Sequence, residues 1–216
     1  DDHGSPITLG SAMIKDMAIS GNGEILSVGK WNTGSESFNK ASRTGQEVLT
    51  IPVRKNGDKK NDVQTLKVMT LTDNSALLIC SIQPGNGLVI KVDPNGDKLW
   101  ERTYDLGDRG VVFTDAAPLG KNGDFVLLGF TGHGEDGSGV FLFDLVLFRC
   151  DVQGKVLTKQ LFPGGISRMS EPQICRLDSG SLVVTYDKNV ELKVTDQRVR
   201  AFSSDLELLW EKQIDR

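Results

Sequence analysis

The segment with His133, Glu135 and Asp136 holds the densest group of residues in this chain that could do chemistry. Imidazole and carboxylate groups this close together can ligate a metal ion or exchange a proton with a substrate. A metal site or a general base usually needs further groups from other segments, and the second histidine, His3, stands near the start of the chain. His133, Glu135 and Asp136 are therefore the candidate metal ligands, and the sequence predicts no catalytic residue and no cofactor.

The glycines around these residues suggest a second chemistry. Gly132-His-Gly-Glu-Asp-Gly137 has the spacing G-x-G-x-x-G, which in dinucleotide-binding proteins joins a strand to a helix and holds pyrophosphate on the helix N-terminus. Here another apolar run follows, and the carboxylates of Glu135 and Asp136 would repel phosphate. The pattern therefore predicts a polar loop rather than a nucleotide site.

Two further patterns are interpreted as structural. Asp93-Pro-Asn-Gly-Asp97 offers oxygen atoms at alternating positions, as the start of a calcium loop does, but it lacks the later bidentate acid and predicts a hairpin turn. The cysteines lie in apolar runs without Cys-x-x-Cys spacing, which indicates buried thiols rather than a zinc site or a disulfide framework. These cysteines are Cys80, Cys150 and Cys175.

The composition of the 216 residues excludes two function classes. Lysine and arginine number 25 against 29 aspartate and glutamate, so there is no basic surplus to bind the phosphates of a nucleic acid. The richest apolar run, Val140–Phe148, contains Asp144 and is shorter than the roughly 18 residues that a membrane helix needs. The sequence starts at Asp1 without methionine or leader, and we expect a processed or trimmed chain or one domain of a longer protein.

The elements that must position these residues come from a repeat. A polar turn followed by an apolar run occurs four times, with the runs starting at Gly23, Ser75, Gly123 and Gly180. A second turn follows each run, at Val53–Gly57, Val92–Gly96, Cys150–Gly154 and, in a degenerate form, Phe202–Leu206. Glycine and small polar residues at such turns join antiparallel strands, and the apolar runs have the length of strands that are buried on both faces.

Each repeat unit is predicted to form four short strands, in units of about 11–64, 65–108, 109–163 and 170–216. Repeated four-stranded units are typical of a β-propeller, in which each blade needs its neighbours to cover its apolar faces. We therefore predict a single all-β domain, a β-propeller of about four four-stranded blades. A β-sandwich would explain the strands but not the fixed order of the two turns. Ser11–Ile19 is predicted as the first strand, although a short amphipathic helix also fits it.

The segment Asp93–Trp100 resembles the Asp-x-x-Gly-x-x-x-Trp signature of quinoprotein-type (PQQ-like) propeller repeats, and Asp205–Trp210 resembles a degenerate second copy. The resemblance implies that Trp100 and Trp210 wedge an outer strand against the next blade. The matching positions of the first and third units hold Asn61 and Thr158. The resemblance also implies an extracytoplasmic location, which is periplasmic, secreted or lipid-anchored, while no residue marks a quinone or calcium site.

The number of blades in the complete ring stays open at this point. Propellers of about this length can close with four blades, whereas quinoprotein-type propellers usually have more. The four units therefore either close directly on one another or form part of a larger ring, and we favour the larger ring.

Long polar connections suggest where a partner would bind. They are predicted to emerge together at one face of the propeller, at about 30–45, 130–139 and 187–193. Loops on a rigid scaffold often carry recognition, and aromatic side chains anchor interfaces, so the predicted binding residues are Trp31, Phe38 and His133. Tolerance of insertions at an exposed face explains the same loops equally well.

The leading hypothesis is a non-enzymatic propeller scaffold that binds a protein or extracellular ligand through this long-loop face. A cofactor- or metal-binding propeller enzyme with an axial site at His133, Glu135 and Asp136 is the first alternative. A carbohydrate-binding propeller is the second, although nine Phe, three Trp and two Tyr leave few rings that could stack on sugars.

Overall fold

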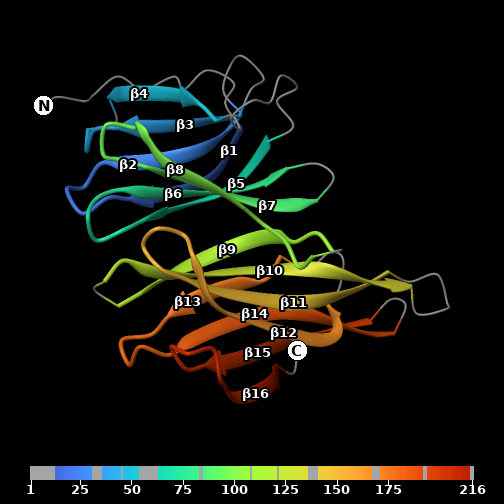
Figure 1. Cartoon of the computed structure of the whole chain (residues 1–216). Helices are drawn as coiled ribbons and strands as arrows, with labels where there is room; N and C mark the ends of the chain where they lie inside the picture. The colour runs from blue at the N-terminus through green and yellow to red at the C-terminus, as the bar shows by residue number, and fades with distance from the viewer. Residues whose placement is uncertain are drawn as a thin grey trace, which may run out of the picture.

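The computed structural model describes residues 13–30, 36–44, 46–53, 63–82, 85–107, 109–120, 122–135, 141–166, 171–191 and 194–214. Within these residues the chain forms sixteen β-strands and no helix, so none of the described segments is a helix that could cross a membrane. The strands form four antiparallel meanders, which we call blades 1 to 4 in chain order (Figure 1). One residue pair, Ile166 with Lys188, joins blades 3 and 4 into an eight-stranded sheet. Met13–Ile19 is a strand, as predicted, and the helix considered for this segment does not form.

Blades 1 and 4 lie within the predicted units 11–64 and 170–216, whereas blade 2 begins before residue 65 and blade 3 ends after residue 163. Blade 1 consists of β1 (Met13–Ile19), β2 (Ile25–Lys30), β3 (Glu36–Ala41) and β4 (Glu47–Pro52). Blade 2 consists of β5 (Val63–Thr70), β6 (Ala76–Ile82), β7 (Asn86–Val92) and β8 (Lys98–Tyr104). Blade 3 consists of β9 (Val112–Leu119), β10 (Asp124–Glu135), β11 (Phe141–Cys150) and β12 (Val156–Ile166). Blade 4 consists of β13 (Gln173–Arg176), β14 (Leu182–Glu191), β15 (Val194–Phe202) and β16 (Leu208–Ile214).

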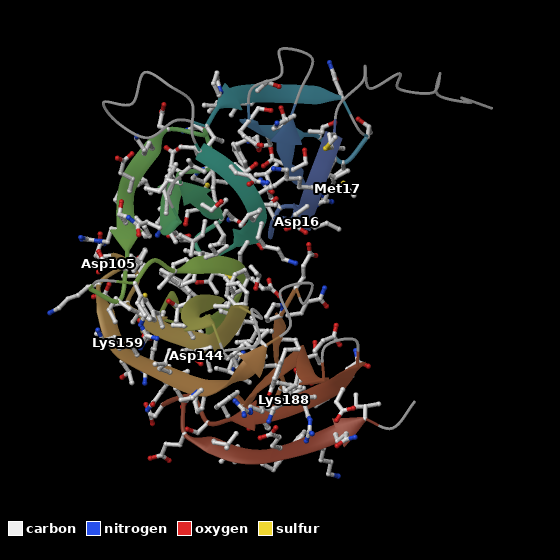
Figure 2. All side chains as sticks on the ribbon, turned by 90° about the vertical axis from the view of Figure 1, so that its right-hand side faces the viewer. Asp16, Met17, Asp105, Asp144, Lys159 and Lys188 are labelled. Atoms are coloured by element: carbon white, nitrogen blue, oxygen red, sulfur yellow. The ribbon has the colours of Figure 1, made fainter. Side chains whose placement is uncertain are left out.

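The blades follow one another in an arc, with the first strand of each blade on the inner side and the fourth on the outer side. The inner strands pack in sequence: β1 on β5, β5 on β9 and β9 on β13. Among the described strands, none of blade 4 packs on one of blade 1, and Figure 2 shows an arc that is open on one side. The described blades therefore have the arrangement of β-propeller blades without closing directly on one another, and the two-layer β-sandwich is excluded.

The hydrophobic core consists of three layers, one between each pair of successive blades. Successive residues of a strand point to opposite faces, so a strand between two other blades must be apolar on both. In β6, Leu77 and Ile79 join the layer shared with blade 3, whereas Leu78 and Cys80 join the layer shared with blade 1. Burial on both faces explains the uninterrupted apolar runs of the sequence.

A tight turn joins the third and fourth strands of each blade. In blade 2 the Asp93 N–H donates to the Asp97 carbonyl at 2.9 Å, and the Asp93 carboxylate accepts from the backbone N–H groups of Asn95 and Asp97. The hairpin turn predicted here is confirmed. The corresponding turns span Ser42–Gln46, Asp151–Lys155 and Ser203–Glu207.

The turn of blade 1 differs from its prediction. The sequence interpretation placed it at Val53–Gly57, but the chain turns at Ser42–Gln46, because β4 already pairs with β3 before residue 53. In blade 2, Trp100 pairs with Lys91 next to a register shift, and in blade 1 Leu49 pairs with Lys40 next to the corresponding shift. Leu49 therefore holds the position that matches Trp100. The assignment to Asn61, which lies outside the described residues, is wrong. The Asn-Gly pair of the predicted turn is the stronger local signal, and it misled the alignment.

Candidate functional site

The predicted metal ligands fall largely outside the described structure. Asp136 lies outside the described residues, and only the backbone is described for His133 and Glu135. That backbone belongs to β10, which pairs with β11 as far as Glu135, so these two residues extend a strand and do not form the predicted loop. Within the described residues, no three His, Cys, Asp or Glu side chains group closely enough to hold a metal ion.

The predicted aromatic anchors also have to be revised. Trp31 lies outside the described residues. Phe38 lies in β3 with 2% of its surface exposed, in the core layer between blades 1 and 2. Its prediction as a surface binding residue is therefore wrong. The polar residues on either side of it made a strand resemble a loop, because they point away from the face that Phe38 shares with blade 2.

The long-loop face is smaller than predicted. Residues 36–41 of the segment 30–45 form β3, β10 continues to Glu135, and β14 continues to Glu191. Strands therefore take up much of all three predicted loops. The site that the structure offers instead lies along the inner strands.

Charged side chains meet on the inner strands of blades 1 to 3. Lys67 on β5 stands between two carboxylates, with its Nζ 3.6 Å from Asp16 Oδ1 on β1 and 3.4 Å from Asp115 Oδ1 on β9. Each of the three residues follows an irregularity in its strand, and such bulges re-aim the next side chain. Figure 2 shows Asp16 on the inner side of the arc and Asp105 and Lys159 on the outer side. We call the following group the axial cluster: Lys15, Asp16, Glu36, Lys67 and Asp115.

Backbone amides hold the two aspartates of the cluster. The Val68 N–H on β5 donates to Asp16 Oδ2 at 2.9 Å, and the Ile174 N–H on β13 donates to Asp115 Oδ2 at 2.9 Å. The Ala116 N–H donates to the other oxygen of Asp115 at 2.8 Å. Each aspartate therefore ties its own inner strand to the inner strand of the next blade.

Burial affects the protonation of Asp115. Removal from water raises the pKa of the Asp115 carboxyl above its ordinary value, while the Ile174 N–H and the Lys67 ammonium oppose the shift. A carboxyl group with a raised pKa beside a second carboxylate is one sign of an acid–base site. In this cluster, however, Lys67 stands between the two acids and pairs with both.

Glu36, the first residue of β3, is buried beside this group. Lys15 Nζ lies 2.8 Å from Glu36 Oε1, and Thr65 of blade 2 donates to Glu36 Oε2 through its hydroxyl and through its N–H, the latter at 3.2 Å. Glu36 therefore connects blades 1 and 2 as Asp16 does. The three carboxylates of the axial cluster all have partners.

Sequence reasoning missed the axial cluster, although a signal for it exists. Asp16, Lys67 and Asp115 are charged residues that recur in the first strand of three successive units. Lys67 and Asp115 are each the one charged residue of their strand, and Lys15 directly precedes Asp16. That recurrence marks a position of interest. The pairing itself could not be inferred, because it depends on distances between blades and on bulges that break the regular alternation of side chains.

The two signature tryptophans have different surroundings. Trp100 on β8 stacks on Phe125 of blade 3, with ring centroids 6.4 Å apart and planes 15° apart, and it packs against the core layer between blades 2 and 3. This contact agrees with the docking role predicted for Trp100. Trp210 on β16 is 44% exposed, and no described blade covers it.

Comparisons with known proteins bear on the fold. No family model and no curated protein matches this chain. A solved protein of unknown function from Dyadobacter fermentans is similar over 94% of this chain and 69% of its own, with a TM-score of 0.60 and 12% identity. An α-L-arabinofuranosidase from Clostridium thermocellum is similar over 94% of this chain and 73% of its own (TM-score 0.55, 13% identity). The Nup133 β-propeller domain of Vanderwaltozyma polyspora is similar over 95% and 63% (TM-score 0.54, 14% identity).

At these identities the similarity shows the fold alone. The chain has a β-propeller fold, as its own strand order and these solved structures agree. The finer resemblance to quinoprotein-type repeats stays a prediction.

Proposed function

We propose that this chain is a non-enzymatic binding module that holds a segment of a partner protein at the axial cluster. The observation that carries the proposal is that the carboxylates of the cluster are already engaged: Asp16 and Asp115 by Lys67 and backbone N–H groups, and Glu36 by Lys15. Groups held in this way are preorganised to bind a ligand. Each of the three carboxylates already has a charged or N–H partner.

The same pairing argues against glycoside hydrolysis. A glycosidase places its substrate between two carboxyl groups, one of which donates a proton while the other accepts a proton or attacks. Lys67 occupies the space between Asp16 and Asp115, within 4 Å of both. A substrate would have to displace this ammonium group and would leave a buried carboxylate without its charge partner.

The charge of the axial cluster indicates the chemistry of its ligand. Three carboxylates face two ammonium groups, which leaves an excess of one negative charge, and Asp16 and Lys67 are partly exposed. A lysine or arginine side chain of a partner would supply the missing positive charge and donate to carboxylate oxygens. We therefore propose a basic segment of a protein as the ligand.

Binding to arrayed short peptides of different charge tests this proposal. We expect peptides with lysine or arginine to bind, and the double variant Asp16→Asn/Asp115→Asn to bind them at least about ten-fold more weakly. Asp105→Asn on the outer side of the arc is the matched control and should bind as the unchanged chain does. Equal binding of basic, neutral and acidic peptides, or unchanged affinity in the folded double variant, would contradict the proposal.

A carbohydrate-binding or carbohydrate-cleaving propeller is the second candidate. It is favoured by the similarity to a structure named as an α-L-arabinofuranosidase and by the two aspartates that flank Lys67. It is disfavoured by the scarcity of rings, since among the described residues Trp210 is the one exposed large aromatic side chain, and it lies on an outermost strand. Release of nitrophenol from a nitrophenyl arabinofuranoside, abolished by Asp115→Asn, would replace our first proposal with this one.

The location of the protein is a separate proposal. The quinoprotein-type signature at Asp93–Trp100 supports a compartment outside the cytoplasm. Fractionation of the source cells followed by detection with an antibody tests it. Recovery of the protein in the cytoplasmic fraction would contradict it.

A further inference from the structure

The outer strand of one blade docks on the tight turn of the next blade in the same way at two successive interfaces. In blade 1, Leu49 and Ile51 cover Gly96, where an added Cβ would lie only 2.4 Å from each side chain. In blade 2, Trp100 covers Gly154, where an added Cβ would lie 2.9 Å from the indole ring. The absence of a side chain at these two glycines is what lets the outer strand of the preceding blade approach.

A cation completes each of these two contacts. Lys40 Nζ donates to the Pro94 carbonyl at 2.8 Å, and Arg102 Nε donates to the Gln153 carbonyl at 2.7 Å. Both carbonyl groups belong to the turn that receives the apolar side chain. Docking at these two interfaces therefore combines an apolar side chain over a turn glycine with a cation on a turn carbonyl.

The outer strand of blade 4 repeats this docking set. The pairing register places three residues of β16 where β8 has Trp100, Arg102 and Tyr104: Trp210, Lys212 and Ile214. In both strands the tryptophan stands beside the same register shift, so its side chain points to the same face of the blade. Tyr104 is 4% exposed and donates to the Gly154 carbonyl at 2.8 Å, whereas Ile214 is 43% exposed.

The opposite end of the arc shows the complementary exposure. Met17, Val68 and Ala116 directly follow the cluster residues of their strands and face the preceding blade. Val68 is 3% exposed, because blade 1 covers it, whereas Met17 is 61% exposed. The residue after the cluster residue is therefore buried where a blade precedes its strand, and exposed at β1. In the same way, the docking residues of the outer strand are covered at β8 and exposed at β16.

Blade 1 of a second copy is a poor match for the face of blade 4. On the side of blade 1 that would receive β16, strand alternation places Ser27, Ser37 and Asn39. The corresponding residues of blade 2, which do receive an outer strand, are Leu78, Leu88 and Ile90. Ser27, Ser37 and Asn39 are polar and at most 8% exposed, so blade 1 of a second copy offers β16 neither an open nor an apolar face, whereas a blade of the blade 2 type offers apolar side chains.

We propose that the face of blade 4 formed by Trp210, Lys212 and Ile214 docks a further four-stranded blade that is not a second copy of this chain. The incoming blade has an apolar face and a five-residue turn with a glycine at the fourth position. Trp210 covers that glycine, and Lys212 donates to a carbonyl of the same turn. The proposal is independent of the ligand proposed for the axial cluster.

A chain extended by one blade tests the proposal. The sequence of residues 63–107, which carries Gly96 and the apolar receiving face of blade 2, is appended after residue 216 through a flexible linker. Hydroxyl-radical labelling, read at Trp210 by mass spectrometry, should fall several-fold and approach the labelling of Trp100. The same extension with Gly96→Val in the appended copy is the matched control and should leave Trp210 labelled.

Two results would overturn the proposal. The first is undiminished labelling of Trp210 in the extended chain, whether the appended blade folds elsewhere or stays unfolded, because docking on blade 4 is what should order it. The second is a dimer of the unextended chain in analytical ultracentrifugation with Trp210 protected, which would make a second copy the occupant. A monomer with Trp210 labelled is the result we expect for the unextended chain.

Discussion

The strands β8 and β16 carry the same docking pattern in different surroundings. Trp100 of β8 lies against Phe125 of the next blade, whereas Trp210 of β16 is largely open to solvent. The pleat of each strand and its pairing register set the direction of the two tryptophan side chains. Pleat and register are encoded locally, in the turn before each strand. Burial is not encoded locally, because it needs a neighbouring blade. The same motif can therefore stabilise one part of this molecule and leave another part ready to bind.

The largest expected difference between the two regions is the effect of removing each tryptophan. Trp100→Ala should lower the free energy of unfolding by about 3 kcal/mol, because it leaves a cavity in the layer between blades 2 and 3. Trp210→Ala should cost less than about 1 kcal/mol, since much of its ring stays in water in the folded state. Urea unfolding of both variants measures the two values. Equal losses would show that the environments do not differ as described.

The turn glycine beneath Trp100 gives a sharper and smaller test. Gly154 has φ 76°, and an added Cβ would meet Trp100 at 2.9 Å and both Arg102 and Tyr104 at 3.0 Å. Gly154→Ala should cost about 2 kcal/mol, from backbone strain together with the contact to the docked strand.

Gly107→Ala is the matched control for this substitution. Gly107 has φ 81°, but nothing lies within 4 Å of the added Cβ, so only the backbone strain of about 1 kcal/mol should appear. The difference between the two free energies of unfolding reports the docking contact. Equal costs at Gly154 and Gly107 would show that Trp100 does not press on the turn.

Local signals predicted most of the fold. The turns at Asp93–Asp97 and Asp151–Lys155 carry their own Asp side chains and glycines, so both turns were predicted to within one residue. Blade 1 was harder, because its polar strand Glu36–Ala41 resembles a loop and an Asn-Gly pair competes with its true turn. The sequence analysis favoured a larger ring over direct closure of four blades, but no local signal says which blades meet.

The candidate site was less accessible to sequence reasoning than the fold. The sequence analysis favoured residues that lie close together in the chain, such as His133 and Glu135, because groups that could act together are easiest to recognise when they are neighbours in sequence. The axial cluster combines Asp16, Lys67 and Asp115 from three blades, and its geometry depends on bulges and on packing of the inner strands. Separated charges in apolar strands predict a position of interest, but not its partner.

The smallest expected effect concerns Asp115 in the axial cluster, which is covered by the blade that follows its own, and the pH dependence of stability that this cover produces. Asp115 is buried because β13 of blade 4 packs beside it, and burial raises the pKa of its carboxyl above the ordinary value, against the opposing effects of Ile174 N–H and Lys67. The folded protein therefore holds this proton at pH values at which the unfolded chain has lost it. The contribution of Asp115 to stability is greatest below its unfolded pKa, near about 4, and is lost as the pH rises towards the raised folded pKa.

Asp115→Asn should remove this decline, because an amide does not titrate while its oxygen can still accept the Ile174 N–H. Urea midpoints measured from pH 4 to pH 7 should therefore shift in favour of the variant as the pH increases. Lys67→Met should steepen the decline, since the ammonium group that lowers the pKa of Asp115 is lost. Parallel pH profiles for all three proteins would mean that Asp115 titrates alike in the folded and unfolded chains, and that cover by blade 4 does not reach the axis.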